Sequence, residues 1–339
     1  TGEATVDLNG HILRYAEEAE PDSIFRVAGG HTLTLTDSRP TAEHEDTTLP
    51  AGGLITGGKG FKYDNGAGQS YNYYGGGVYV DGGGFTMSGG TIGGTKTGET
   101  NTATYGGGGV YAKANFEMTG GSITGNNAAY GGGVCVSKNG SFEMSGSSCI
   151  TNNKADSYGG GVNINYASAT FTMKGGSITG NNAYKSDYIS TFGGGVCVGS
   201  GIFTVSGEVT VTDNTKGGTK GADGKFTGDT KNNVYLPTGK TITIGTDKLS
   251  EGAQLGVTVS GDYGDYPFTS GWNDNMSDKT PSDYFISDTD GYVAKLNGSE
   301  LKMVTHVHNW TYAASGDTIT ATCKNCSNNN GNDFSGGSV

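Results

Sequence analysis

The tetrapeptide Gly-Gly-Gly-Val occurs five times in this chain, and it constrains the fold more than any other feature. The copies end at Val78, Val110, Val134, Val162 and Val196, at spacings of 32, 24, 28 and 34 residues. A phenylalanine follows each copy, and an isoleucine or valine follows each phenylalanine (Phe85 and Ile92, Phe116 and Ile123, Phe142 and Ile150, Phe171 and Ile178, Phe203 and Val211). Internal repetition at a period of about 20–50 residues is the signature of repeat architectures. The sequence therefore predicts one long stack of similar units.

Apolar and polar residues alternate within each unit. Val78 and Val80 share one face while Tyr79 takes the other, and Phe85-Thr86-Met87 repeats this period of two. A third short segment carries the isoleucine, and glycine-rich turns separate the three. A unit this small cannot close a core alone, but stacked copies pair their backbones with the coils above and below. The pattern predicts an all-β, right-handed parallel β-helix, a three-strand solenoid, because parallel crossovers are nearly always right-handed.

The regularity of the repeat divides the chain into segments. Residues 1–260 are predicted to form the β-helix, with regular coils at about 75–215. The pattern fades over 261–304, which we expect to form a C-terminal cap, because an uncapped β-helix end would recruit other strands. Residues 305–326 are predicted to form a small hairpin module, and 327–339 read as a polar linker or tail.

Composition excludes several other classes of protein. Glycine accounts for 64 of 339 residues without recurring at every third position, and prolines number 6, which excludes collagen. The 19 tyrosines argue against a disordered chain. The net charge is −12 and the basic face that nucleic acids require is not visible, so no nucleic-acid partner is expected. No apolar run approaches the roughly 20 residues that span a bilayer, so we expect no transmembrane segment.

Stacking predicts two ladders of structural side chains. The aromatic residue before each glycine run should pile along one corner (Tyr74, Tyr105, Tyr130, Tyr158, Phe192). Asparagines should form an amide ladder at another corner (Asn126-Asn127, Asn152-Asn153, Asn181-Asn182, Asp213-Asn214). Cys135 and Cys197 hold the same repeat position two coils apart, beyond the reach of a disulfide.

A ligand site is predicted where the connections between coils are long. The segments 93–105 and 183–192 leave the same corner and would wall a shallow groove. We expect its floor to include Tyr111, Lys113, Asn163 and Asn165. Exposed rings of the kind on which sugars stack would come from Tyr79, Tyr111, Tyr184 and Tyr188. Loops carry function more often than strands do, so the groove is the first place to seek a glycan.

Two acidic residues on adjacent coils, Glu117 and Glu143, could share a cation such as calcium. The alternative is a solvent-exposed pair relieved by Lys174. Few carboxylates point outward from the predicted coils, and this weighs against an enzyme, because a glycosidase needs two carboxylates about 5–9.5 Å apart on one face. We therefore expect no catalytic residues.

The C-terminal hairpin carries a possible metal site. His306 and His308 lie two residues apart on one face of the expected first strand of the hairpin, and Cys323-Lys-Asn-Cys326 follows the turn. Two imidazoles and two thiolates make the four ligands that a structural zinc site uses. The alternatives are a frayed tail and a local Cys323–Cys326 disulfide.

The repeat unit and two N-terminal stretches, Val6–His11 and Phe25–Asp37, resemble the β-helix regions of large bacterial cell-surface proteins with the pectin-lyase-like fold. The segment from Asn233 to Val293 resembles the closing part of such proteins, and the hairpin resembles a small module often appended to them. The resemblance implies an exported, adhesin-like or scaffold role in a larger surface protein, with no catalytic residue carried over.

The sequence thus predicts a non-enzymatic, extracellular or cell-surface β-helix that acts as a stalk or adhesin and binds a glycan or a host-surface protein. Two alternatives remain open. One is a polysaccharide lyase or glycoside hydrolase of the β-helix fold, and the other is a purely structural spacer.

Overall fold

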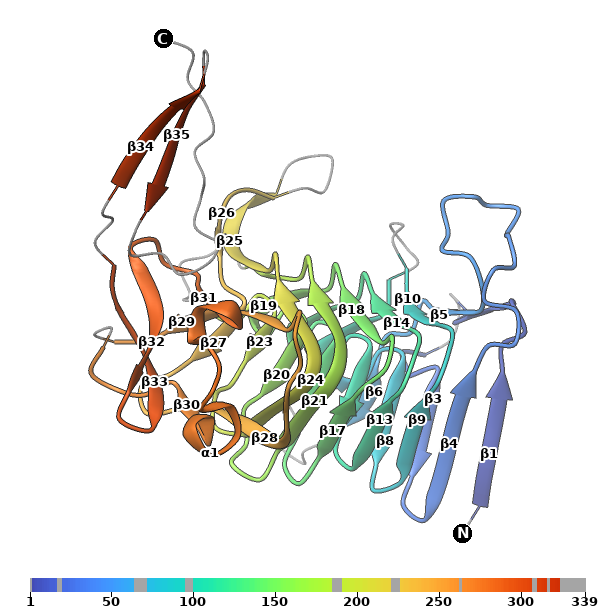
Figure 1. Ribbon diagram of the computed structural model, residues 1–339. Helices are drawn as coiled ribbons and strands as arrows, with labels where there is room; N and C mark the ends of the chain where they lie inside the picture. The colour runs from blue at the N-terminus through green and yellow to red at the C-terminus, as the bar shows by residue number, and fades with distance from the viewer. Residues whose placement is uncertain are drawn as a thin grey trace.

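The computed structural model describes the chain except for residues 1, 17–19, 64–71, 95–99, 185–190, 221–225, 262–263, 307–309, 316–317 and 324–339. Its body is a stack of parallel β coils (Figure 1). Parallel pairings join 23 strands into one hydrogen-bonded set. The prediction of an all-β chain built from stacked parallel strands is confirmed. In the described part of the chain, no helix has the length and apolar character needed to cross a bilayer.

Register divides these strands into three rows. The first row holds the Gly-Gly-Gly-Val strands and their counterparts: β3 (Phe25–Ala28), β8 (Val78–Asp81), β12 (Val110–Ala112), β16 (Val134–Val136), β20 (Val162–Ile164), β23 (Val196–Cys197) and β27 (Val234–Leu236). The second row holds the phenylalanine strands: β1 (Gly2–Asp7), β4 (His31–Thr36), β9 (Gly84–Met87), β13 (Asn115–Met118), β17 (Ser141–Met144), the first halves of β21 (Thr170–Thr179) and β24 (Ile202–Thr212), β28 (Ile242–Leu249) and β30 (Thr269–Ser270). The third row holds the isoleucine strands: β2 (Ile12–Arg14), β5 (Leu54–Thr56), β10 (Thr91–Gly93), β14 (Ser122–Thr124), β18 (Cys149–Thr151), the second halves of β21 and β24, β29 (Gln254–Val259) and β31 (Phe285–Ser287). The second half of β29 also extends the first row, where it pairs with β27.

The interior is filled by ladders of like side chains. The rings of Phe85, Phe116, Phe142, Phe171 and Phe203 stack with centroids 5.1, 4.6, 4.7 and 4.9 Å apart and planes within 15° of parallel. All five are buried. Because the coils repeat in register, each aromatic ring meets the same residue above and below, and stacking follows from the repeat itself.

The predicted amide ladder is confirmed for one residue of each predicted pair, at the corner after the third row. Its members are Asn101, Asn126, Asn153, Asn181, Asn214 and Asn233, all buried. Each Nδ2 donates to the Oδ1 of the next residue at 2.9–3.0 Å. The ladder ends at the carboxylate of Asp288, which accepts hydrogen bonds from the Nδ2 and the backbone N–H of Asn233 at 2.6 and 2.7 Å.

The coils differ from the prediction in having a fourth strand between the amide corner and the next glycine run. These strands form an outer sheet of β7 (Asn72–Tyr74), β11 (Thr102–Gly106), β15 (Asn127–Tyr130), β19 (Lys154–Tyr158), β22 (Asn182–Ala183) and β25 (Thr215–Lys220). At its two ends the sheet closes with antiparallel strands, β6 (Phe61–Tyr63) beside β7 and β26 (Phe226–Lys231) beside β25. These two hairpins finish the edges of the outer sheet, where further strands would otherwise add.

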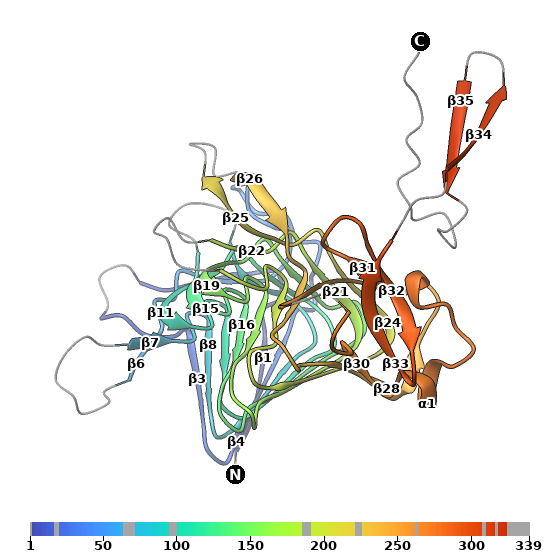
Figure 2. The same ribbon diagram turned by 90° about the vertical axis from the view of Figure 1, so that its left-hand side faces the viewer.

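The segment expected to cap the stack first contributes two more parallel strands, β30 and β31, to the last coil. It then adds the helix α1 (Trp272–Met276), the 3-10 turn η1 (Pro281–Asp283) and an antiparallel pair, β32 (Tyr292–Asn297) with β33 (Glu300–Thr305). Trp272, Met276 and Leu301 are buried in the main core. A separate hairpin follows, β34 (Trp310–Ser315) with β35 (Thr318–Cys323), and it projects from the body (Figure 2).

Candidate functional site

The outward face of the first strand row carries residues of several chemical types along the stack. Register aligns the members in one line: Arg26, Tyr79, Tyr111, Cys135, Asn163, Cys197 and Tyr235. The inward positions of the same strands are all apolar and repeat closely, so they serve the core. Variation in the outward line is therefore where this face can differ chemically from coil to coil.

The prediction that Tyr79 and Tyr111 are exposed is wrong. Tyr79 is 2% exposed and Tyr111 is 6% exposed. The outer sheet covers them: the centroid of the Tyr74 ring lies 4.7 Å from that of Tyr111 and 6.4 Å from that of Tyr79. The glycine run makes this cover possible, since its first residue adopts a left-handed conformation (φ 61° at Gly75) that folds the fourth strand sharply back. The Tyr111 hydroxyl donates a hydrogen bond to Ser137 Oγ at 2.8 Å instead of reaching solvent.

The predicted aromatic ladder is confirmed, and Tyr235 extends it by one ring. Successive centroids of Tyr74, Tyr105, Tyr130, Tyr158, Phe192 and Tyr235 lie 5.0, 5.1, 5.7, 6.0 and 4.2 Å apart. Every member is half-buried. Partial burial raises the pKa of the Tyr105 hydroxyl to about 12, so it is neutral at ordinary pH. The ladder presents a strip of aromatic surface along the stack, with Lys216 Nζ 5.0 Å from the centroid of the Phe192 ring.

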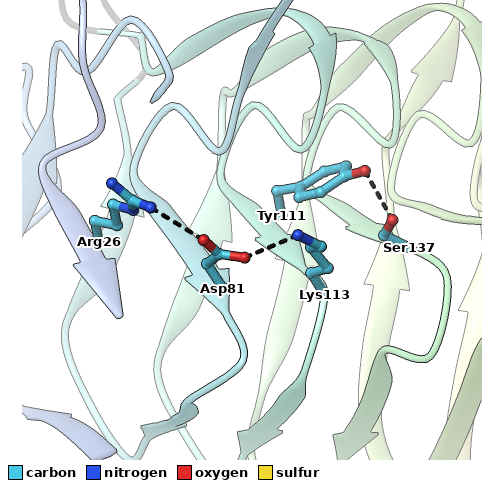
Figure 3. Close-up of polar contacts among 5 residues, drawn as sticks. All are labelled: Arg26, Asp81, Tyr111, Lys113 and Ser137. Atoms are coloured by element: carbon cyan, nitrogen blue, oxygen red, sulfur yellow. Dashed lines mark hydrogen bonds and ion pairs between the residues drawn. The ribbon is translucent and has the colours of Figure 1, made fainter. Parts of the chain in front are cut away.

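A charged cluster lies at the N-terminal end of this strip. Asp81 accepts a hydrogen bond from Arg26 through Oδ2 at 3.1 Å and one from Lys113 through Oδ1 at 2.9 Å (Figure 3). Three successive strands of the first row, β3, β8 and β12, supply the three side chains. The Arg26 and Lys113 side chains are 46% and 43% exposed.

Two aromatic residues of β6 border the cluster. The Arg26 guanidinium carbon lies 4.0 Å from the centroid of the Phe61 ring, and Lys113 Nζ lies 5.9 Å from that of Tyr63. Both distances are within the range of cation–π attraction. Phe61 is half-buried against Tyr79, with centroids 5.0 Å apart, whereas Tyr63 is 46% exposed. The cluster thus joins two cations to one accessible ring.

The electrostatics of the cluster favour binding over proton transfer. Burial acts to raise the pKa of Asp81, but the hydrogen bonds and charges of Lys113 and Arg26 outweigh it and leave that pKa below its usual value. The hydrogen bond to Asp81 raises the pKa of Lys113. General acid–base catalysis is most effective when a pKa lies near the working pH. The pKa of Asp81 falls and that of Lys113 rises, so both move further from neutral pH and both groups stay charged.

The remaining residues of the predicted groove differ in how far they are buried. Asn163 is buried, and its Oδ1 has no hydrogen-bond partner among the described residues. Asn165 is exposed and Tyr184 is half-buried. Tyr188 lies outside the described residues. Cys135 and Cys197 flank Asn163 in register, as expected, and burial raises the pKa of both thiols to about 12.

The predicted metal sites are wrong for the part of the chain that the structure describes. There, no group of three or more His, Cys, Asp or Glu side chains comes together that could hold an ion. His306 follows β33, and its backbone N–H donates to the Gly291 carbonyl at 2.7 Å, so it belongs to the capping pair and not to the β34–β35 hairpin. Cys323 ends β35, while His308 and Cys326 lie outside the described residues.

The calcium alternative fails for a different reason. Glu117 and Glu143 do face the same side of adjacent strands, as expected. However, Lys174 Nζ lies 2.9 Å from Glu143 Oε2, so a cation from the chain itself already neutralises this carboxylate. The prediction that Lys174 relieves the pair is the one that the geometry supports.

Sequence reasoning missed Arg26, Phe61, Tyr63 and Asp81 as neighbours. Arg26 lies in a coil without the Gly-Gly-Gly-Val motif, 55 residues before Asp81. The available signal was alternation: Phe25 and Val27 point inward, which places Arg26 on the outward face, in register with Tyr79.

Comparison with known proteins adds no relative. No family model matches the chain, and no curated protein or solved structure matches it significantly.

Proposed function

We propose that this chain is a non-catalytic, exported β-helix module of the adhesin or stalk type, which binds saccharides along its aromatic strip. The proposal includes a right-handed coil of the pectin-lyase-like kind and a place on or outside the cell surface, as the resemblance of the repeats implies. One observation carries the binding role: six half-buried rings follow one another along the stack at centroid distances of 4.2–6.0 Å.

Saccharides suit this strip for physical reasons. A sugar ring has one face rich in C–H groups, which packs on an aromatic ring, while its hydroxyls remain available for hydrogen bonds. Aromatic rings contribute a large contact area at a low cost in conformational entropy. The parallel stack holds the rings at fixed positions, so little ordering is required on binding.

The charged groups beside the strip support binding over catalysis. Asp81 and Lys113 form an ion pair that keeps both groups ionised, and the buried tyrosines have raised pKa values. None of these shifts prepares a general acid or base for neutral pH.

The experiment is a glycan array and polysaccharide pull-down with the whole chain, comparing Tyr105→Ala with Tyr312→Ala. Tyr105 is a half-buried member of the aromatic strip, whereas Tyr312 lies on the projecting hairpin and is 70% exposed. We expect Tyr105→Ala to weaken binding and Tyr312→Ala to leave it unchanged. Binding to no glycan would favour the spacer alternative. Release of reducing or unsaturated sugar would overturn the non-catalytic role.

A further inference from the structure

The cluster of Arg26, Asp81 and Lys113 places charged groups at the N-terminal end of the aromatic strip. Two cations and one carboxylate leave a local charge of +1 (2 − 1), on a chain whose net charge is −12. The chain as a whole repels anions. A positive spot on such a surface therefore selects for a ligand whose negative charge can be placed at this point.

We propose that this cluster is a subsite for a saccharide that carries an anionic substituent, either a carboxylate or a sulfate ester. The inference rests on the proposed function and names the class of ligand for it. The anion is held between Arg26 and Lys113, and the sugar that bears it packs against Tyr63.

The hydrogen-bonding capacity of the two cations supports this assignment. A guanidinium has five N–H donors and an ammonium has three. Toward the described side chains, each cation makes one hydrogen bond, to opposite oxygens of Asp81. Both side chains remain more than two-fifths exposed, so donors are left to face a ligand. Asp81 fixes the two cations on either side of itself and thereby prepares the site before the anion arrives.

The position of Tyr63 supplies the second contact. Lys113 Nζ is 5.9 Å from the centroid of this ring, a distance that one monosaccharide with its substituent can bridge. Tyr63 meets Tyr74 edge to face, with centroids 6.1 Å apart and planes at 87°. The ring is thereby held upright beside the start of the aromatic strip, so a chain bound at the cluster can continue along Tyr74 and Tyr105.

The outward face of the second strand row offers a matched control. Lys174 forms one ion pair, at 2.9 Å with Glu143, and its side chain is 42% exposed. Lys113 forms its pair with Asp81 at the same distance and with nearly the same exposure. The two lysines differ in their surroundings: a second cation and an accessible ring accompany Lys113.

The test compares three polymers with one backbone: dextran, dextran sulfate and carboxymethyl dextran. Binding is measured with the whole chain, and with Lys113→Met, Arg26→Met and Lys174→Met, after unfolding midpoints establish that each variant is folded. We expect at least one anionic polymer to bind tenfold or more tightly than dextran. We expect Lys113→Met and Arg26→Met each to reduce that affinity about tenfold, and Lys174→Met to change it less than about twofold. Tenfold corresponds to about 1.4 kcal/mol. The two anionic polymers distinguish sulfate from carboxylate.

Several outcomes would overturn the proposal. Equal affinity for dextran and both anionic derivatives would remove the anion subsite and leave saccharide binding intact. An equal loss in Lys113→Met and Lys174→Met would attribute anion binding to general charge. Binding to no polymer, together with a negative glycan array, would reject the proposed function as well.

Discussion

The inner and outer aromatic ladders of this protein follow the same repeat but differ in regularity. Inside, successive phenylalanine rings are 4.6–5.1 Å apart and nearly parallel. Along the outer corner, centroid distances range from 4.2 to 6.0 Å and ring planes meet at 8° to 60°. The inner ladder is sealed on all sides, so packing permits one arrangement. The outer ladder touches solvent on one side, which leaves the rings several arrangements.

This difference separates stability from function along the chain. Residues of the inner ladder have the same environment at each coil, and the fold depends on their sameness. On the outward line, the residue type varies along the stack, from Arg26 through Tyr79 and Tyr111 to Cys135. Substitutions should therefore affect stability strongly inside and binding mainly outside.

The largest expected effect is the loss of an inner ring. Phe142→Ala should lower the free energy of unfolding by about 3–5 kcal/mol, because Phe142 is buried between two stacked rings. Tyr130→Ala removes a half-buried ring of the outer ladder and should cost about 1–2 kcal/mol. Urea unfolding followed by circular dichroism measures both values. Equal losses would contradict the division between an inner and an outer ladder.

The next effect concerns the amide ladder. Asn153→Ala would remove the side-chain partner of the Ile123 carbonyl and of the Asn126 backbone N–H. The Asn126 Nδ2 and the Asn181 Oδ1 would each lose one of two partners, because they keep the Ile92 carbonyl and the Asn153 backbone N–H. Buried groups left unsatisfied cost about 1–3 kcal/mol each, with partial relaxation, so a loss of about 2–4 kcal/mol is expected. The exposed amide of Asn165 provides the control, since Asn165→Ala should change stability by less than about 0.5 kcal/mol. A small loss in Asn153→Ala would mean that water replaces the missing amide.

A smaller effect tests the turn that folds the outer sheet over the first row. Gly107 has φ 67°, and a Cβ there would lie 2.3 Å from the Val110 carbonyl oxygen. Gly239 has φ 76°, with nothing within 4 Å of such a Cβ. The left-handed conformation alone costs a non-glycine residue about 1–2 kcal/mol. Gly239→Ala should lose about that much, and Gly107→Ala should lose at least about 1 kcal/mol more. Thermal unfolding of the two variants gives the comparison.

The regular part of the fold was predictable because it repeats. Five copies of the Gly-Gly-Gly-Val motif place the valines, phenylalanines and isoleucines in register, and the structure has those pairings. The asparagine and tyrosine ladders followed from the same alignment. Any residue with an equivalent in the next coil could be placed from the sequence alone.

The fourth strand and the charged cluster were not predictable in this way. The outer strands are short, and their alternation is weak, although a buried alanine recurs in them (Ala103, Ala128, Ala155, Ala183). Because the sequence did not reveal this outer sheet, Tyr79 and Tyr111 were expected at the surface. Arg26 and Asp81 meet because β3 pairs with β8 across an irregular coil of about fifty residues. Contacts between an irregular coil and a regular one have no periodic signal.

The smallest expected effect concerns two carboxylates: Asp288, at the end of the amide ladder, and Asp81, in the charged cluster. Burial raises the pKa of Asp288, which ends the amide ladder, despite hydrogen bonds from Asn233 and Thr258. For Asp81, burial acts in the same direction, but Lys113 and Arg26 outweigh it and lower the pKa. The ordinary pKa of both carboxyl groups is 3.8. The two residues should therefore give the protein opposite dependences of stability on pH.

The signs follow from proton binding in the folded and unfolded chains. Above pH 3.8, Asp288 keeps its proton to a higher pH in the folded chain than in the unfolded chain. Its contribution to the free energy of unfolding therefore falls as pH rises from 3.8 through the raised pKa. The contribution of Asp81 is present above 3.8 and is lost as pH falls through its lowered pKa. Asp288→Asn should accordingly gain stability relative to the parent chain as pH rises, and Asp81→Asn should lose it. Unfolding free energies measured from about pH 2 to about pH 7 test both slopes. Slopes of the same sign would mean that Asp288 is ionised in the fold, held by Asn233 as firmly as Asp81 is held by its two cations.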